Sequence, residues 1–123
     1  MTEIQSLRAA LLHLHRELLQ VQRGEAERFG GRMTAAETLQ AAADDLRFSW
    51  LRELSTLITE LDQARSDGDP QQVAAGVERA RALLAPPDPD SSFGARYLTV
   101  LQDPPAAVLA HRDVTAALAP LDS

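Results

Sequence analysis

Apolar side chains recur every three or four residues along the first part of the chain. The stripe consists of Ile4, Leu7, Leu11, Leu14, Leu18 and Val21. This spacing places them on one face of an amphipathic helix, which we expect to run from about residue 3 to 29. Thr2 and Gln5 form a capping-box pair at its start. Gly30-Gly31 ends it, because glycine accepts the left-handed conformation that closes a helix.

A second helix is predicted to begin at the capping box formed by Thr34 and Glu37. Its apolar residues are Leu39, Ala42, Ala43 and Leu46. Aspartate prefers caps to helix interiors, so Asp44-Asp45 predicts a break and a third helix over about 46–65. No glycine or proline lies within 35–65, which leaves one continuous helix as the alternative.

Aspartate, serine and proline mark the later helix starts. Asp69 as N-cap and Pro70 as first residue predict a helix that ends at Pro86-Pro87. Ser91 or Ser92 caps the next helix, and Asp103-Pro104 starts the last. The residues expected to face inward are Val73, Val77, Ala80, Leu83, Leu84, Phe93, Tyr97, Val100, Leu101, Val108, Leu109, Val114 and Leu118. Further candidates are a close helix approach at Gly76 and a second break near Asp113.

These elements predict an all-α fold. The short connections favour antiparallel neighbours, so we expect an up-down, four-helix-bundle-like single domain over residues 1–123. A long N-terminal helix would serve as its spine, with extra short helices beside the main columns.

Composition narrows the function classes. The net charge is −6, so no nucleic-acid partner and no membrane surface is expected. Cysteine is absent, which excludes thiolate metal sites and a cysteine nucleophile. The start of the chain lacks a basic segment, and no window approaches about twenty uninterrupted apolar residues. We therefore expect a cytoplasmic protein, with no cofactor.

The segment around Trp50, the only tryptophan, is the most distinctive. The residues expected to form the structural core here are Trp50, Leu54, Leu57, Leu61 and Phe48. A core tryptophan would satisfy its indole N–H with a backbone carbonyl or water. The alternative is an exposed anchor for a protein partner, since tryptophan is favoured at interface hot spots.

Arg52 and Ser55 are the candidate binding residues of this segment. With Phe48 and Thr59 they share a face of the helix predicted over about 46–65, one step off the core face. Arg52 would either pair with a carboxylate from another helix or bind a small anion. In the second case, the walls of a ligand site at one end of the bundle would come from His15, His111, Trp50 and Tyr97.

The histidines predict no metal site. His13 and His15 point roughly 200° apart on a helix, and no His-Glu-x-x-His or Glu-x-x-His pattern occurs. Arg8 and His13 match the loose Arg-x4-His spacing of helical nucleases of the HEPN type. Five helical residues rotate by about 140°, so these two side chains would converge only across a dimer.

The pattern Phe48-x-Trp50-Leu51-Arg52-x-Leu54-Ser55 resembles a family of small uncharacterised bacterial all-helical proteins. Glu60-x-Asp62, Tyr97-Leu98 and Val108-Leu109-Ala110-His111 look like that family too. The family tends to have proline after the Asp45 position and at the Glu53 position, where this chain has Leu46 and Glu53. The resemblance implies the helical architecture and assigns no activity.

Three functional hypotheses follow. The first is a non-enzymatic interaction or scaffold protein of the bacterial cytoplasm, whose long leucine-rich helix extends past its neighbours and pairs with a protein partner or a second copy. The second is a small-ligand or anion-binding bundle, or an enzyme, that uses Arg52 and a histidine at one end. The third is RNA cleavage by Arg8 and His13 across a dimer.

Overall fold

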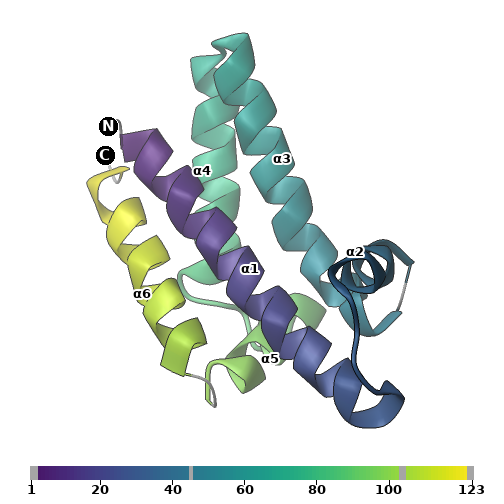
Figure 1. The fold of residues 1–123 in the computed structure, drawn as a ribbon. Helices are drawn as coiled ribbons and strands as arrows, with labels where there is room; N and C mark the ends of the chain where they lie inside the picture. The colour runs from purple at the N-terminus through teal and green to yellow at the C-terminus, as the bar shows by residue number, and fades with distance from the viewer. Residues whose placement is uncertain (1–2, 45, 103–104, 122–123) are drawn as a thin grey trace.

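The structure is a computed structural model that describes residues 3–44, 46–102 and 105–121. Every regular element within these ranges is helical. The α-helices are α1 (Glu3–Gly30), α2 (Ala35–Asp44), α3 (Arg52–Asp67), α4 (Pro70–Leu84), α5 (Ser92–Val100) and α6 (Pro105–Leu118) (Figure 1). Two 3-10 helices, η1 (Leu46–Leu51) and η2 (Ala119–Leu121), complete the order. The predicted all-α fold is confirmed.

Four long helices, α1, α3, α4 and α6, run along the molecule, and the short α2, η1 and α5 gather at one end (Figure 1). We call this the closed end. The opposite end holds the start of α1, the turn between α3 and α4, and η2, and we call it the open end. There the α3–α4 hairpin projects beyond the ends of α1 and α6 (Figure 1).

The leucine stripe of α1 forms the centre of the core. Leu7, Leu11, Leu14 and Leu18 are each 0% exposed, since α6, α3 and η1 pack against α1. Full burial of a leucine contributes roughly 1.5–3 kcal/mol, so this stripe is a major source of stability. The idea that α1 presents uncovered leucines is therefore wrong, and the projecting element is the α3–α4 hairpin.

Several predicted helix ends have the expected geometry. The Thr34 N–H donates to Glu37 Oε1 (3.0 Å) and the Glu37 N–H donates to Thr34 Oγ1 (3.1 Å), which is a complete capping box. The Asp69 side chain accepts from two N–H groups at the start of α4, and Ser91 caps α5. Thr2 and Asp103-Pro104 lie outside the described residues.

Helix α2 ends at Asp44, as predicted, and Asp45 lies outside the described residues; α3 begins at Arg52 instead of residue 46. Residues 46–51 form η1, which has about three residues per turn where an α-helix has 3.6. The face predicted to join Phe48 to Arg52 and Thr59 is therefore wrong. Phe48 is 1% exposed, whereas Arg52 and Thr59 are exposed.

Helix α6 differs from the prediction in two respects. It continues through Asp113 without a break. Its buried positions include Ala107 and Ala110, while Val108 is 39% and Leu109 54% exposed. The inward orientation predicted for Val108 and Leu109 is therefore wrong, because the first half of α6 faces the core with Ala107 and Ala110. No helix within the described ranges is long and apolar enough to span a lipid bilayer.

Candidate functional site

Arg52 and Ser55 lie in the first turn of α3. Arg52 lines a groove of about 740 Å³ between α3, α4 and the loop before α5. The Ser55 hydroxyl donates to the Arg52 carbonyl (3.1 Å). Arg79 lines the same groove and pairs with Glu60 (2.6 Å). Neither Tyr97 nor a histidine lines this groove, so the fold separates the two halves of the predicted ligand site.

Tyr97 and His111 form a hydrogen-bonded pair between α5 and α6. Tyr97 is 0% exposed, and its Oη lies 2.7 Å from His111 Nδ1. Burial raises the pKa of the Tyr97 hydroxyl and lowers that of His111. Tyr97 therefore keeps its proton and His111 is biased toward the neutral form, so the hydroxyl donates to Nδ1 when the imidazole proton is on Nε2.

The pair belongs to an aromatic column that fills the closed end. We use this name for Trp50, Phe93, Tyr97 and His111. Their ring centroids are 5.7 Å apart for Trp50 and Phe93, 5.4 Å for Phe93 and Tyr97, and 5.5 Å for Tyr97 and His111. These separations lie within the range of favourable aromatic contacts. The column links η1, α5 and α6.

A polar cluster from α1 and α5 covers the Trp50 end of the column. The Trp50 indole N–H donates to Gln22 Oε1 (2.9 Å), and Gln22 is 3% exposed. Arg96 pairs with Glu25 and lies 5.6 Å from the centre of the Trp50 ring, within cation–π distance. The hydrogen bond from Arg96 is the main reason that the pKa of Glu25 is lowered.

This cluster was not predicted. The indole partner is a side-chain amide instead of the expected backbone carbonyl or water. Trp50 itself is only partly buried and packs against the core, whereas Leu54, Leu57 and Leu61 are at most 4% exposed. The sequence feature that pointed to a buried polar cluster was Gln22, a polar residue at the position that continues the leucine stripe from Leu18.

The remaining candidates on α1 lie apart from these groups. His15 is half-buried, and burial lowers its pKa. Arg8 pairs with Asp62 of α3 through a 2.5 Å contact, whereas His13 lines a groove between α1 and α6. Arg8 thus ties α1 to α3 and does not face His13. Within the described part of the chain, no three histidine or acidic side chains cluster in a way that could hold a metal ion.

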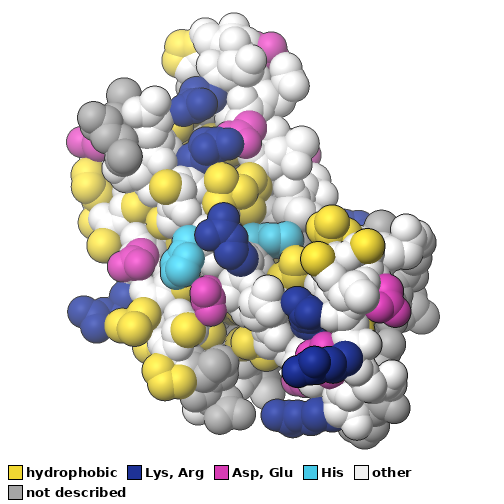
Figure 2. All heavy atoms as spheres, in the orientation of Figure 1, with side chains coloured by type: hydrophobic (Ala, Val, Ile, Leu, Met, Phe, Trp, Pro, Cys, Tyr) yellow, Lys and Arg dark blue, Asp and Glu magenta, His cyan; other side chains and the backbone are white. Residues whose placement is uncertain are grey.

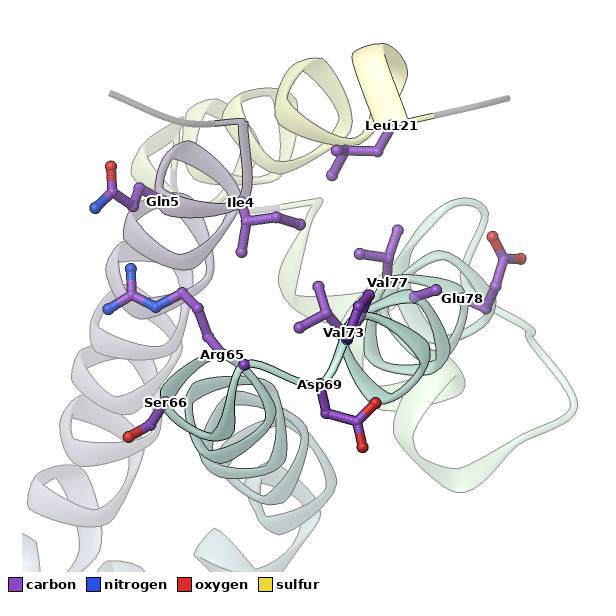
Figure 3. Close-up of a pocket in the computed structure, with 12 residues that line it drawn as sticks. Ile4, Gln5, Arg65, Ser66, Asp69, Val73, Val77, Glu78 and Leu121 are labelled. Carbon is purple, nitrogen blue, oxygen red and sulfur yellow. The ribbon is translucent and has the colours of Figure 1, made fainter.

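A wide cavity lies at the open end. It measures about 940 Å³, within the range of about 300–1,000 Å³ for binding pockets. Figure 3 shows Ile4 of α1, Val73 and Val77 of α4, and Leu121 of η2 pointing into one space. We call this cavity the open-end groove. It lies where the α3–α4 hairpin projects past α1 and α6 (Figure 1).

One arginine gives the open-end groove its polar character. Arg65 lines it, and its side chain makes no ion pair or hydrogen bond with a residue in the described ranges. The acidic residues of the rim are engaged, since Asp69 caps α4 and Glu78 pairs with Arg81. Among the residues that the structure describes, the groove therefore combines an apolar floor with an arginine whose charge is not paired.

Comparison with protein-family models, with curated proteins and with solved structures finds no match to this chain, so its function has to be argued from this geometry.

Proposed function

We propose that this protein is a non-enzymatic interaction module that receives an amphipathic helix of a protein partner in the open-end groove. The observation that carries this proposal is the apolar floor of the open-end groove, where Ile4, Val73 and Leu121 are only partly buried beside the buried Val77. An amphipathic helix that lays its apolar face into a hydrophobic groove is a recurrent mode of protein recognition.

The shape of the open end favours a helix as the occupant. Each long helix of the bundle already packs against others, and the hairpin tip extends that packing surface past α1 and α6. A partner helix placed there would continue the bundle and bury Val73, which is partly exposed in the free protein. Its apolar residues would recur at the three- and four-residue spacing of a helix face.

The charge of the open end favours an acidic residue on that partner helix. Arg65 sits at the edge of the groove without an ion-pair partner among the described residues. A carboxylate beside the apolar face of the incoming helix would pair with it in a partly desolvated setting, where such a bond is stronger than on an open surface.

Site-specific photo-crosslinking in the native cell tests this proposal. A photoreactive residue replaces Val73 in the groove, and the control carries it at Gln20, an exposed position of α1 outside the groove. We expect one discrete adduct from position 73 only. Mass spectrometry should map it to a segment with apolar helical periodicity and an adjacent acidic residue, and Arg65→Glu should reduce its yield at least tenfold.

Equal adducts from both positions would overturn the proposal, as would no adduct from position 73. An adduct to a small molecule at position 73 would also overturn it, and would assign the groove to a ligand. Arg65→Ala serves as the charge-neutral control and should reduce the yield less than Arg65→Glu, because it removes the attraction without adding repulsion.

Anion binding is a second candidate function, favoured by one observation. Arg52 and Arg79 line the same groove between α3 and α4, together with Ser49 and Ser91. Titration calorimetry with inorganic phosphate would test it. Heat that is lost with Arg52→Ala and kept with Arg65→Ala would support an anion site there, and no heat from the wild type at millimolar phosphate would remove it.

A further inference from the structure

Helix α6 has an outward face that is less polar than a solvent-facing helix normally is. Positions 105, 109, 112 and 116 recur at helical spacing opposite the buried alanines, and they are Pro105, Leu109, Arg112 and Ala116. Leu109 is 54% exposed, and the adjacent Val108 is 39% exposed. Figure 2 shows hydrophobic side chains gathered over α6 and its border with α1, at the left of the view.

The border with α1 is also shallow and lined by small side chains. A groove of about 530 Å³ runs between the two helices. Its lining includes Ala9 and Ala10 of α1 and Ala116 and Ala117 of α6. Small side chains allow another helix to approach closely, and a protruding leucine fits such a surface as a ridge fits a groove.

Two opposite charges stand next to each other in the middle of this face. Arg112 and Asp113 are exposed, and neither side chain makes an ion pair within the described part of the chain. Consecutive helical residues do not face each other, so this pair does not satisfy itself. A partner surface with the same two charges in reverse order would pair with both.

A second copy of α6 in antiparallel orientation supplies that order. A two-fold axis between positions 112 and 113 brings Arg112 of each copy to Asp113 of the other. The same axis places Leu109, three residues before Arg112, opposite Ala116, three residues after Asp113. Each large side chain then meets a small one, and each charge meets its opposite.

We propose that the outer face of α6 is the interface of a homodimer, in which two copies pack antiparallel about the Arg112–Asp113 position. A 14-residue helix is only about 21 Å long, so the buried area falls below the roughly 800 Å² per partner of a standard interface. We therefore expect a reversible dimer with a dissociation constant in the micromolar range.

Dimerisation by this face would make the protein bivalent. The α6 helix runs from the closed end to the open end, so an antiparallel pair directs the two open-end grooves in opposite directions. This consequence rests on the proposed function, whereas the dimer itself does not. A bivalent module bridges two partner helices, and its avidity exceeds the affinity of either groove.

Sedimentation equilibrium from about 5 μM to 1 mM tests the dimer directly. The wild type should approach twice its monomer mass at the upper concentration. Leu109→Glu should raise the dissociation constant at least tenfold, since it places a carboxylate against Ala116 of the other copy. Leu39→Glu is the matched control, because Leu39 is 68% exposed on α2, away from this face.

A charge exchange separates the interface from general surface effects. Arg112→Asp and Asp113→Arg should each weaken self-association. In either variant, positions 112 and 113 carry the same charge, so each of them meets a like charge of the second copy across the axis. An equimolar mixture of the two variants should dimerise as strongly as the wild type, because every contact across the axis becomes opposite in sign. Circular dichroism should show unchanged helix content in both.

Three outcomes would overturn the proposal. These are a wild type that stays monomeric at 1 mM, a Leu109→Glu variant that associates like the wild type, and a mixture no stronger than the separate variants. Crosslinking at Val73 is independent of all three, so the failure of the dimer and the failure of the proposed function are distinguishable.

Discussion

The closed and open ends are built by the same four long helices, yet only one of them is filled. At the closed end, η1 and α5 insert Trp50, Phe93 and Tyr97 between the helices. At the open end, Ile4, Val73 and Leu121 are only partly buried, and they line the open-end groove. Filled space is a source of stability, and unfilled apolar space is where a partner can bind.

The largest expected effect compares one deletion at each end. Phe93→Ala should lower the free energy of unfolding by about 3–5 kcal/mol, because Phe93 is 0% exposed and contacts both neighbours in the column. Val73→Ala removes a partly exposed side chain at the groove and should cost less than about 1 kcal/mol. Urea denaturation followed by circular dichroism measures both. Equal costs would mean that the two ends are packed alike.

A glycine at each end gives a smaller, sharper contrast. A Cβ at Gly94 would lie 1.8 Å from the Asp88 carbonyl oxygen, so Gly94→Ala must displace backbone and should cost about 1–3 kcal/mol or more. A Cβ at Gly76 would meet only the tip of Leu61 at 2.9 Å, and helix propensity favours alanine there. The midpoint temperature of thermal unfolding should therefore be much closer to that of the wild type for Gly76→Ala than for Gly94→Ala. Gly24→Ala, in open space, should stabilise.

The smallest effect is a pH dependence that belongs to buried histidines. Burial lowers the pKa of His111 and His15 from 6.5, so between the folded and unfolded pKa values the unfolded chain binds more protons. This contribution to stability is complete above about pH 6.5 and is lost as the pH falls through the folded pKa values.

Replacing both histidines with glutamine should flatten the slope of the unfolding free energy below pH 6.5, measured by urea titration at several pH values. His13→Gln is the control, since its side chain is exposed. A slope that persists in the double variant would show that other groups titrate in this window. Arg96 lowers the pKa of Glu25, so the ionised carboxylate also contributes to stability. This contribution is lost at lower pH, as the carboxyl is protonated.

Local signals in the sequence were reliable where a few neighbouring residues decide the outcome. The box formed by Thr34 and Glu37, the cap at Asp69, and the end of α1 before Gly31 needed only backbone groups within one turn. Predictions that depended on which face of a helix a residue occupies over several turns were wrong. Phe48 and Arg52 were assigned one face because η1 was read as α-helix, and Leu109 was assigned to the core because leucine is more apolar than Ala110.

The candidate site was predicted only in pieces. Tyr97 and His111 were both named, but their hydrogen bond depends on how α5 packs against α6. Arg52 was named as the charge of a ligand site, yet Arg65 is the arginine at the open-end groove. No local pattern distinguishes them, since both lie on α3 and each is exposed.

The sequence alone determined the helical class, the caps and turns, and the leucine stripe of α1, because these follow from periodicity and from hydrogen bonds within a few residues. Only the tertiary structure decided which end of the bundle is filled, that α6 packs through alanine and leaves Leu109 outside, and that Trp50 bonds Gln22. Those outcomes depend on where helices end relative to one another. A single chain pattern does not encode relative position, because packing is settled by side chains far apart in sequence.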